Sequence, residues 1–330
     1  MPSPLLLVLA LGAAAPDPST AAPAAAPAWS DFPGLPIYVP MNPVEYTRSA
    51  LFSPPILRPT QGWAFSLQLD YASAIELYGN TPNSFLLDAE LYRLTFTATF
   101  RVSEEVFILA AGGFQGAYNG VLDGVLNWYH SLLGISYEAR NLRPKNVFGY
   151  RFTSGQLVEA WDPVALTLLD TRLGVGWMIA KNLQLLGTVV VPTAWFDGYA
   201  AHTVQFGALL TWQTPLWSWF DFQGTVGVGA TPRTGGLLGQ YQNVVFGSAS
   251  VGGRARVSEH NYLYLNFFFQ TPLYANTGDP PLDYVDGSLD FGWMFRTDSN
   301  WEFSAGMTED PVAAGPAVDI VFRFGVRHGF

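Results

Sequence analysis

The chain has 330 residues, a formal net charge of -10 and no cysteine. Aromatic residues make up 15% and charged residues 13% of it, against about 25% charged residues in ordinary soluble domains. The acidic net charge and the lack of a block of Lys or Arg argue against a nucleic-acid-binding surface. The lack of cysteine excludes disulfides and thiolate metal sites.

The N-terminus has the pattern of an export signal. Residues 4–15, "PLLLVLALGAAA", match the length of a signal-peptide core and are too short to cross a bilayer as a helix. Small residues at 26–28, "APA", offer a cleavage site, although the preceding "MPS" lacks the usual positive charge. We predict a signal peptide at residues 1–28, with an unstructured tail as the alternative.

Residues 29–62 are rich in proline, which denies hydrogen-bond donors to sheets and interrupts helices. We predict an extended lead-in that lies in the periplasm or plugs a lumen. The second possibility rests on apolar side chains that would otherwise be exposed to water. These are Ile37, Tyr38, Val39, Leu51 and Phe52.

From Trp63 onward, apolar and polar residues alternate with the period of a β-strand. In "WAFSLQLDY" every second residue from Trp63 is apolar, and "LYRLTFTATFR" repeats the pattern from Tyr92. Such runs predict twelve strands. They lie near residues 63–71, 91–101, 106–114, 164–178, 183–193, 202–212, 217–230, 243–257, 262–270, 286–296, 301–309 and 319–330.

The predicted connections alternate in length. Short turns fall at residues 103–105, 180–182, 213–216, 258–261 and 297–300, and the links between them run to about ten residues or more. Short periplasmic turns and long outer loops are typical of outer-membrane barrels. With an even number of strands, the first strand begins and the last strand ends on the short-turn side of the barrel.

The direction of the apolar face decides between two architectures. Twelve strands that present so many aromatic rings inward would overfill a closed barrel, so we expect the apolar face to meet lipid. A two-sheet sandwich is the soluble alternative, but it leaves the export signal and the loop asymmetry unexplained. The fold class predicted for residues 63–330 is all-β: a closed antiparallel transmembrane β-barrel of about twelve strands, with one helical segment in a long loop.

The final strand resembles the C-terminal strand of Gram-negative outer-membrane barrel proteins. Phe322, Phe324, Val326 and Phe330 share one phase, and His328 departs from the usual aromatic residue. The resemblance implies the outer membrane of a Gram-negative bacterium as the location. It also implies contact with outer-membrane lipid, and with the barrel-insertion machinery that reads a terminal aromatic residue.

The longest loop, residues 119–150, carries a pattern of polar and aromatic residues. It consists of Asp123, Trp128, His130 and Gly134, followed by Arg140, Arg143 and Pro144. This pattern, together with the early "MNP" at residues 41–43, resembles the outer-membrane family known as domain of unknown function 3187, which implies no established activity. Within the loop an apolar stripe predicts a helix, which we expect to fold into the barrel mouth as a constriction or gate.

Charged residues gather in the inward phase of the predicted strands. The predicted lumen charges are Arg93, Arg101, Arg172, Arg254, Arg256, Arg296, Arg323, Arg327, Asp70, Asp170, Asp221, Asp290, Glu302 and Asp319. Five of the arginines fall near the periplasmic rim, where a positive ring would favour anions. Arg–carboxylate ladders that lace the wall together are the alternative, and the more common use of such pairs.

The pattern favours a passive channel or binding protein for small solutes, not an enzyme, with no cofactor or metal. A structural or envelope-assembly barrel with a closed lumen is the alternative, and a rim-sited hydrolase is a third. For the hydrolase, Asp197 with His202 and Asp123 with His130 are the candidate pairs, but neither has a nucleophile at a diagnostic spacing. A lone histidine such as His130 is more often a structural hydrogen-bonding residue.

Overall fold

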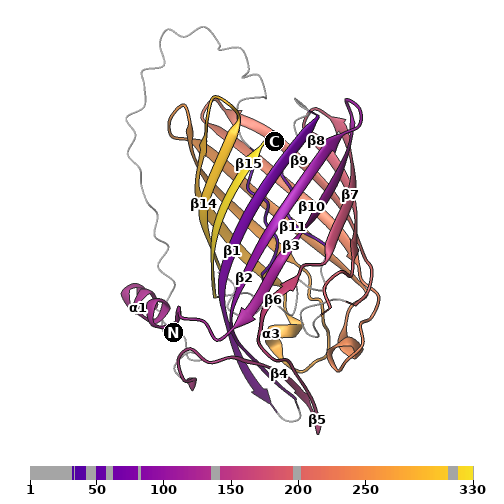
Figure 1. Cartoon of the computed structure of the whole chain (residues 1–330), viewed down its shortest axis with the longest axis vertical. Coiled ribbons are helices and arrows are strands. Elements are labelled where there is room, and N and C mark those ends of the chain that lie inside the picture. Colours follow the sequence, from indigo (N-terminus) through magenta and orange to yellow (C-terminus); the bar gives the residue numbers. More distant parts are fainter. Residues whose placement is uncertain are drawn as a thin grey trace.

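A computed structural model describes residues 32, 34–41, 50–56, 62–80, 83–134, 142–195, 202–310 and 319–329. Twelve antiparallel strands form a closed barrel (Figure 1). In ring order they are β1 (Trp63–Asn80), β2 (Asn83–Arg101), β3 (Val106–Tyr118), β7 (Thr171–Ala180), β8 (Leu183–Val191), β9 (Gln205–Trp217), β10 (Phe220–Ala230), β11 (Val245–Arg256), β12 (Asn261–Gln270), β13 (Asp286–Arg296), β14 (Trp301–Glu309) and β15 (Ile320–His328).

The barrel closes where its first and last strands pair. β1 and β15 run antiparallel from Phe65 opposite His328 to Ser73 opposite Ile320. Between β3 and β7 the chain leaves the barrel wall, and the direct pairing of β3 with β7 continues the wall across this interruption. Closure satisfies the backbone groups of the wall internally, which a lipid environment requires. No helix within the described ranges is long and apolar enough to cross a membrane.

The remaining elements lie at the end of the barrel opposite the short turns (Figure 1). β4 (Gly149–Ser154) pairs with the start of β2 and continues into β5 (Leu157–Ala160), and β6 (Val164–Leu168) pairs with the end of β3. The helices are α1 (Asp123–Leu133), the short α3 (Pro280–Asp283) and the 3-10 helix η2 (Leu238–Tyr241).

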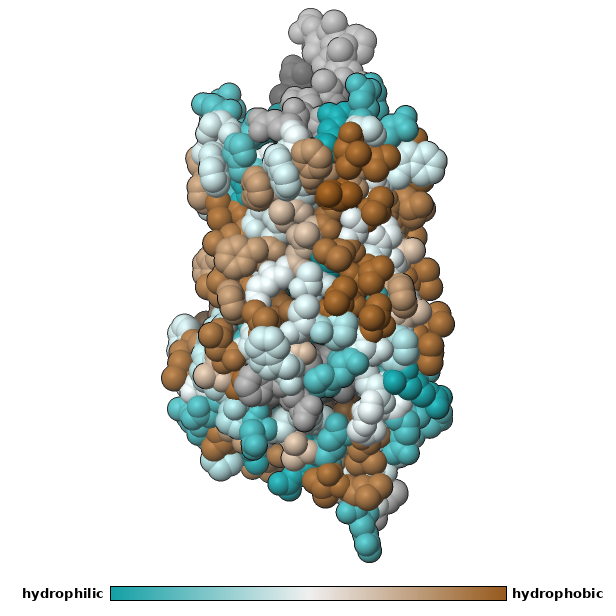
Figure 2. Space-filling model, turned by 45° about the vertical axis from the view of Figure 1, so that its right-hand side comes forward, coloured by the Kyte–Doolittle hydropathy of each residue, from teal (hydrophilic) through white to brown (hydrophobic). Residues whose placement is uncertain are grey.

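The two faces of the wall differ as the alternation predicts. On β1 and β15, Leu69 and Phe324 are 40% and 55% exposed, whereas their neighbours Asp70 and Arg323 are fully buried. Figure 2 shows an apolar band along the barrel with hydrophilic residues gathered toward the lower end. The prediction that apolar side chains face outward and charged side chains face the lumen is confirmed.

Aromatic residues mark the two ends of the apolar band. Exposed tryptophans lie beside the short turns, and a cluster of tyrosines lies toward the other end, where Tyr118 contacts both Tyr71 and Tyr92. Amphipathic rings favour the two membrane interfaces, so this distribution fits a spanning barrel. The tryptophans are Trp63, Trp177, Trp217, Trp219 and Trp301.

Three boundaries differ from the sequence prediction. Residues 72–80 and 83–90, predicted as a loop, belong to the long hairpin of β1 and β2, and β4 pairs there with the edge of β2. Residues 72–75 and 87–90 are all buried, so neither phase of the hairpin faces lipid at these positions. The turn predicted at 213–216 lies at 218–219, and the strand predicted at 164–178 is divided into β6 and β7.

One cluster of buried apolar side chains runs from the lumen into the loops at the outer end. Within the lumen it includes Leu51 and Phe52. In the outer region it joins β2, the β4–β5 hairpin, η2 and the segment between β12 and β13. Its members there include Phe85, Leu87, Tyr150, Phe152, Trp161, Leu238, Leu273 and Leu282.

Candidate functional site: the barrel lumen

The inner wall is built on a ladder of alternating charges. Strand register places Asp70 of β1 directly between Arg93 of β2 and Arg323 of β15. Asp70 accepts hydrogen bonds from Arg93 at 2.9 Å and from Arg323 at 2.7 Å, and Arg323 also reaches Asp290 of β13 at 2.6 Å. All four side chains are almost completely buried. Mutual pairing offsets part of the cost of burying these charges away from water.

Two glycines make room for Tyr264 on the inner wall beside this ladder. A Cβ on Gly306 would lie 2.0 Å from the hydroxyl of Tyr264, and one on Gly292 would lie 2.9 Å from its ring. The tyrosine side chain therefore lies flat over two positions of β13 and β14 that have no side chain of their own. Glycine is required here for close approach, not for an unusual backbone angle.

Two further groups of charges pair nearer the short-turn rim. Arg254 donates to Asp221 at 2.5 Å, and both side chains are buried. Glu302 accepts from Arg327 and lies 3.7 Å from Arg296, which also donates to Asn300 at 2.8 Å. These contacts tie β10 to β11, and β14 to its neighbours β13 and β15.

The other predicted lumen charges have different surroundings. Arg101 donates to the carbonyl of Ser103 at 2.8 Å in the adjoining turn. Asp170 accepts from the backbone amide of Ala194 at 2.9 Å. Asp319 lies at the outer end of the barrel wall, with its carboxylate 3.4 Å from His130 of α1. Arg172 and Arg256 contact aromatic rings of the N-terminal lead-in.

The described part of that lead-in lies inside the barrel. We call residues 32–41 and 50–56, apart from position 33, the lumen segment. Its backbone carbonyls accept hydrogen bonds from inward side chains of four strands, and Ser53 contacts a fifth. These five strands lie on different sides of the barrel, so one segment can contact the inward side chains of all of them only from inside the lumen. The wall residues are Arg93 of β2, Arg327 of β15, Gln184 of β8, Gln223 of β10 and Ser250 of β11.

Aromatic rings provide the second attachment of the lumen segment. The guanidinium groups of Arg172, Arg256 and Arg323 lie 4.3, 4.7 and 5.0 Å from the ring centroids of Phe52, Phe32 and Tyr38, respectively. Tyr38 and Ser53 also exchange two backbone hydrogen bonds, which pair the two halves of the segment. Sequence reasoning found the buried apolar residues of the lead-in but not these contacts, because no local pattern specifies them.

The loop helix forms where it was predicted but does not enter the mouth. Figure 1 shows α1 beside the barrel, and Tyr129 donates to Glu309 of β14 at 3.2 Å. Asp123 accepts from the amide of Asn146, and Trp128 is 64% exposed. The expectation that the helix enters the mouth as a constriction or gate is therefore wrong, because its polar residues bind the outer ends of β14 and β15. Arg143 pairs with Asp88 at 2.9 Å, and Arg140 lies outside the described residues.

Of the two candidate pairs for a hydrolase, Asp123 and His130 do not come together in the described structure. His130 contacts Asp319 and Asp123 contacts Asn146, so the two are held apart by separate partners. Asp197 lies outside the described residues, as do the predicted signal peptide and Phe330. Within the described ranges, no group of three His, Cys, Asp or Glu residues is arranged to hold a metal.

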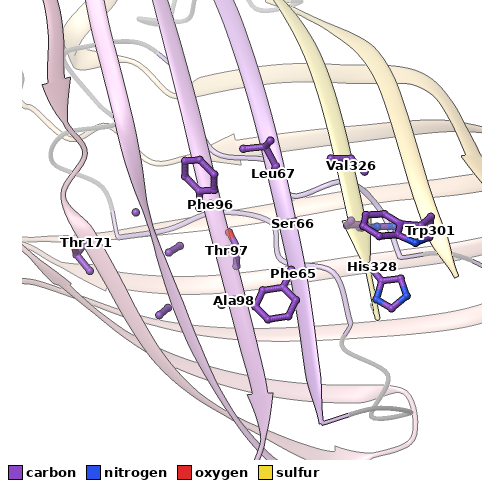
Figure 3. Close-up of a pocket in the computed structure, with 14 residues that line it drawn as sticks. Phe65, Ser66, Leu67, Phe96, Thr97, Ala98, Thr171, Trp301, Val326 and His328 are labelled. Carbon is purple, nitrogen blue, oxygen red and sulfur yellow. The ribbon is translucent and has the colours of Figure 1, made fainter.

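A shallow hollow of about 570 Å³ lies on the opposite, lipid-facing side of the wall. It crosses β14, β15, β1, β2, β3 and β7, and Figure 3 shows Phe65, Phe96 and Trp301 around it. Small residues, among them Ala98 and Ala110, lie between these rings. The hollow is thus continuous with the apolar belt, and two inner-wall residues, Thr97 and Arg327, also contribute to its lining.

A closed twelve-stranded barrel with an apolar outer face, interfacial aromatic residues and a charged interior is a β-barrel of the Gram-negative outer membrane. The family of proteins of unknown function called DUF3187 matches residues 41–330. The chain belongs to this family.

Solved structures that superpose on this chain are also outer-membrane barrels. An outer membrane channel of the COG4313 group from Pseudomonas putida F1 has a TM-score of 0.52 and 11% identity, over 82% of this chain and 96% of that one. The Pseudomonas putida toluene transporter TodX has a TM-score of 0.41 and 9% identity, over 83% of this chain and 91% of that one. The KdgM porin has a TM-score of 0.41 and 5% identity, over 81% of this chain and 99% of that one. The first likeness shows a shared fold. No curated protein matches the sequence.

Proposed function

We propose that this protein is a passive outer-membrane channel for small solutes whose lumen segment closes the pore. The observation that carries the proposal is the attachment of one extended, proline-rich segment to inward side chains of five barrel strands. A wall lined with charged and amide groups is suited to water and polar solutes. The COG4313 protein of similar fold is an outer membrane channel, which supports this assignment.

The type of attachment supports a reversible closure. The bonds to Pro40, Leu35, Pro54 and Pro55 run from side chains to carbonyl groups, and water can replace each of them when the segment moves. Between the segment and β2, β3, β7 and β8 there remains a cavity of only about 20 Å³. A solute would need displacement of the segment to pass along this side of the lumen.

The pairing of the inner-wall charges bears on selectivity. Arg254, Arg296 and Arg327 at the short-turn rim each have a carboxylate within 4 Å. These contacts favour the interpretation that rim arginines lace the wall together, over that of a ring of free positive charge. While these pairs persist, we therefore expect no strong anion preference from the rim of the conducting channel.

A reversible crosslink tests the closure directly, because the chain has no native cysteine. The hydroxyl oxygens of Ser53 and Ser250 are 3.0 Å apart, close enough for a disulfide after Ser53→Cys with Ser250→Cys. In planar bilayers the oxidised variant should be silent, and reductant should restore the conductance steps of the wild-type protein. The Ser53→Cys single variant is the control and should not respond to reductant.

Equal conductance in the oxidised and reduced forms, with the crosslink verified by mass spectrometry, would show that the segment is not the gate. The second candidate function is a structural barrel with a closed lumen. It is favoured by the apolar cluster that continues from Leu51 and Phe52 into the outer loops. Silence of the wild-type, single and reduced double variants, all with intact folds, would select this function.

A further inference from the structure

Arg172 differs from the arginines that form the charge ladder. No carboxylate lies within ion-pair distance of it in the described structure, and its Nε is buried without a hydrogen-bond partner. One face of its guanidinium is covered by the ring of Phe52 at 4.3 Å. The nearby Arg93 already donates to Asp70 and to the carbonyls of Val39 and Pro40. Arg172 as a whole is partly buried, and a partly buried cation without a counter-charge carries a desolvation cost that a bound anion would offset.

Strand register explains why there is space beside this cation. Thr97 of β2 lies opposite Ala111 of β3, and Ala111 lies opposite Arg172 of β7. These three inward residues form one row across the wall, and the small central side chain leaves a gap between the hydroxyl and the guanidinium. The lumen segment covers the gap with Phe52 and Pro55.

The resulting cavity has the size of a single small particle. Its volume is about 20 Å³, and about 10–15 Å³ is enough for one water-sized occupant. Its polar lining comes from Arg172, Thr95, Thr97 and Gln184, and the rest of the lining is largely apolar. Gln184 also donates to the carbonyl of Pro55 at 3.4 Å. The charged member of the lining is a cation, and the hydroxyl groups can donate to an anion.

We propose that this cavity binds a small monovalent anion of the size of chloride, held by Arg172 and the threonine hydroxyls beneath the lumen segment. Water alone would satisfy the buried N–H group but would leave the charge uncompensated. Larger organic anions do not fit the volume. Because the segment forms one side of the cavity, the bound anion stabilises the closed arrangement. The site does not depend on whether the barrel conducts.

Chloride and gluconate at equal ionic strength provide the test, with thermal unfolding of the detergent-solubilised protein as the readout. The unfolding midpoint of the wild-type protein should rise by a few degrees with chloride and then saturate. Gluconate should have no such effect. Arg172→Met should abolish the chloride dependence, whereas Arg101→Met, which removes a rim arginine bonded to a turn carbonyl, should preserve it.

A second measurement keeps the proposal testable if Arg172→Met fails to fold. Crystals of the wild-type protein grown in bromide should show an anomalous peak within hydrogen-bond distance of Arg172, and Thr97→Val should weaken that peak. An equal response to chloride and gluconate, or a bromide map without a peak in this cavity, would overturn the assignment. Neither result would bear on the disulfide test of closure, because that test measures conductance.

Discussion

At the scale of single residues, the inner wall shows how a lumen tolerates buried charge. Asp70 has guanidinium groups on two sides, and Arg323 has carboxylates on two sides. Composition and strand phase predict that these residues point inward. They do not predict the pairing, because it depends on the register of β1, β2, β13 and β15, which the alternation of single strands leaves open.

Arg323→Met should be the most destabilising of the conservative arginine substitutions in the ladder. It leaves Asp70 and Asp290 buried with one fewer cation, and breaking such a pair costs about 3–5 kcal/mol. Denaturant unfolding in detergent micelles measures the change. Arg296→Met is the matched control, since its partner Glu302 keeps Arg327, and the loss there should be below about 1 kcal/mol. Similar losses for both variants would contradict the ladder.

At the scale of elements, the sequence predicts strands well where one face meets lipid and the other meets the lumen. All twelve barrel strands were expected near their observed positions. Prediction fails where this two-sided environment ends. The outer half of β2 pairs with β4, and the apolar residues of its run "FLLDAEL" occupy the phase that faces the lumen farther along the strand. These are Phe85, Leu87, Ala89 and Leu91. The contacts of the lumen segment also lie beyond sequence reasoning, because an extended proline-rich chain has no periodic pattern to read.

The segment between β12 and β13 provides a pH-dependent test at this scale. Asp279, just before α3, is buried, and neither oxygen of its carboxylate has a hydrogen-bond partner in the described structure. Burial, followed by the nearby charge of Asp283, raises the pKa of Asp279 from 3.8 to about 7. A raised carboxyl pKa means that the protonated form is favoured in the fold. Its stabilising contribution is therefore complete below about pH 4 and is lost as the pH rises through 7.

Asp279→Asn should remove this dependence. Between pH 5 and 8 the midpoint of wild-type thermal unfolding should fall, and the variant should fall less and be a few degrees more stable at pH 8. Hydrogen exchange of residues 277–285 locates the effect. Asp298→Asn, at a carboxylate that is 95% exposed, is the control and should follow the wild-type profile. Parallel profiles for all three proteins would refute the raised pKa.

At the scale of the whole molecule, everything follows from the orientation of the wall. The charged phase is buried against the lumen segment and the apolar phase is exposed over the band between the tryptophan and tyrosine clusters. In a water-soluble protein this arrangement would leave Phe324 and its neighbours in contact with water. In a membrane the same residues face acyl chains, while the β4–β5 hairpin extends past the band (Figure 1).

Two lysine substitutions at exposed apolar positions distinguish these environments. Phe324 lies midway along β15 and is 55% exposed, and Leu157 of β5 is 64% exposed. Phe324→Lys should cost about 2–4 kcal/mol, because the charge would sit near the middle of the bilayer. Leu157→Lys should change the stability by less than about 0.5 kcal/mol, because water reaches that position. Reversible folding into lipid vesicles measures both. Equal tolerance of the two lysines is the outcome expected for a soluble sandwich, since water would surround either position. That outcome would contradict the orientation of the wall, in which the apolar face meets lipid and the charged face meets the lumen.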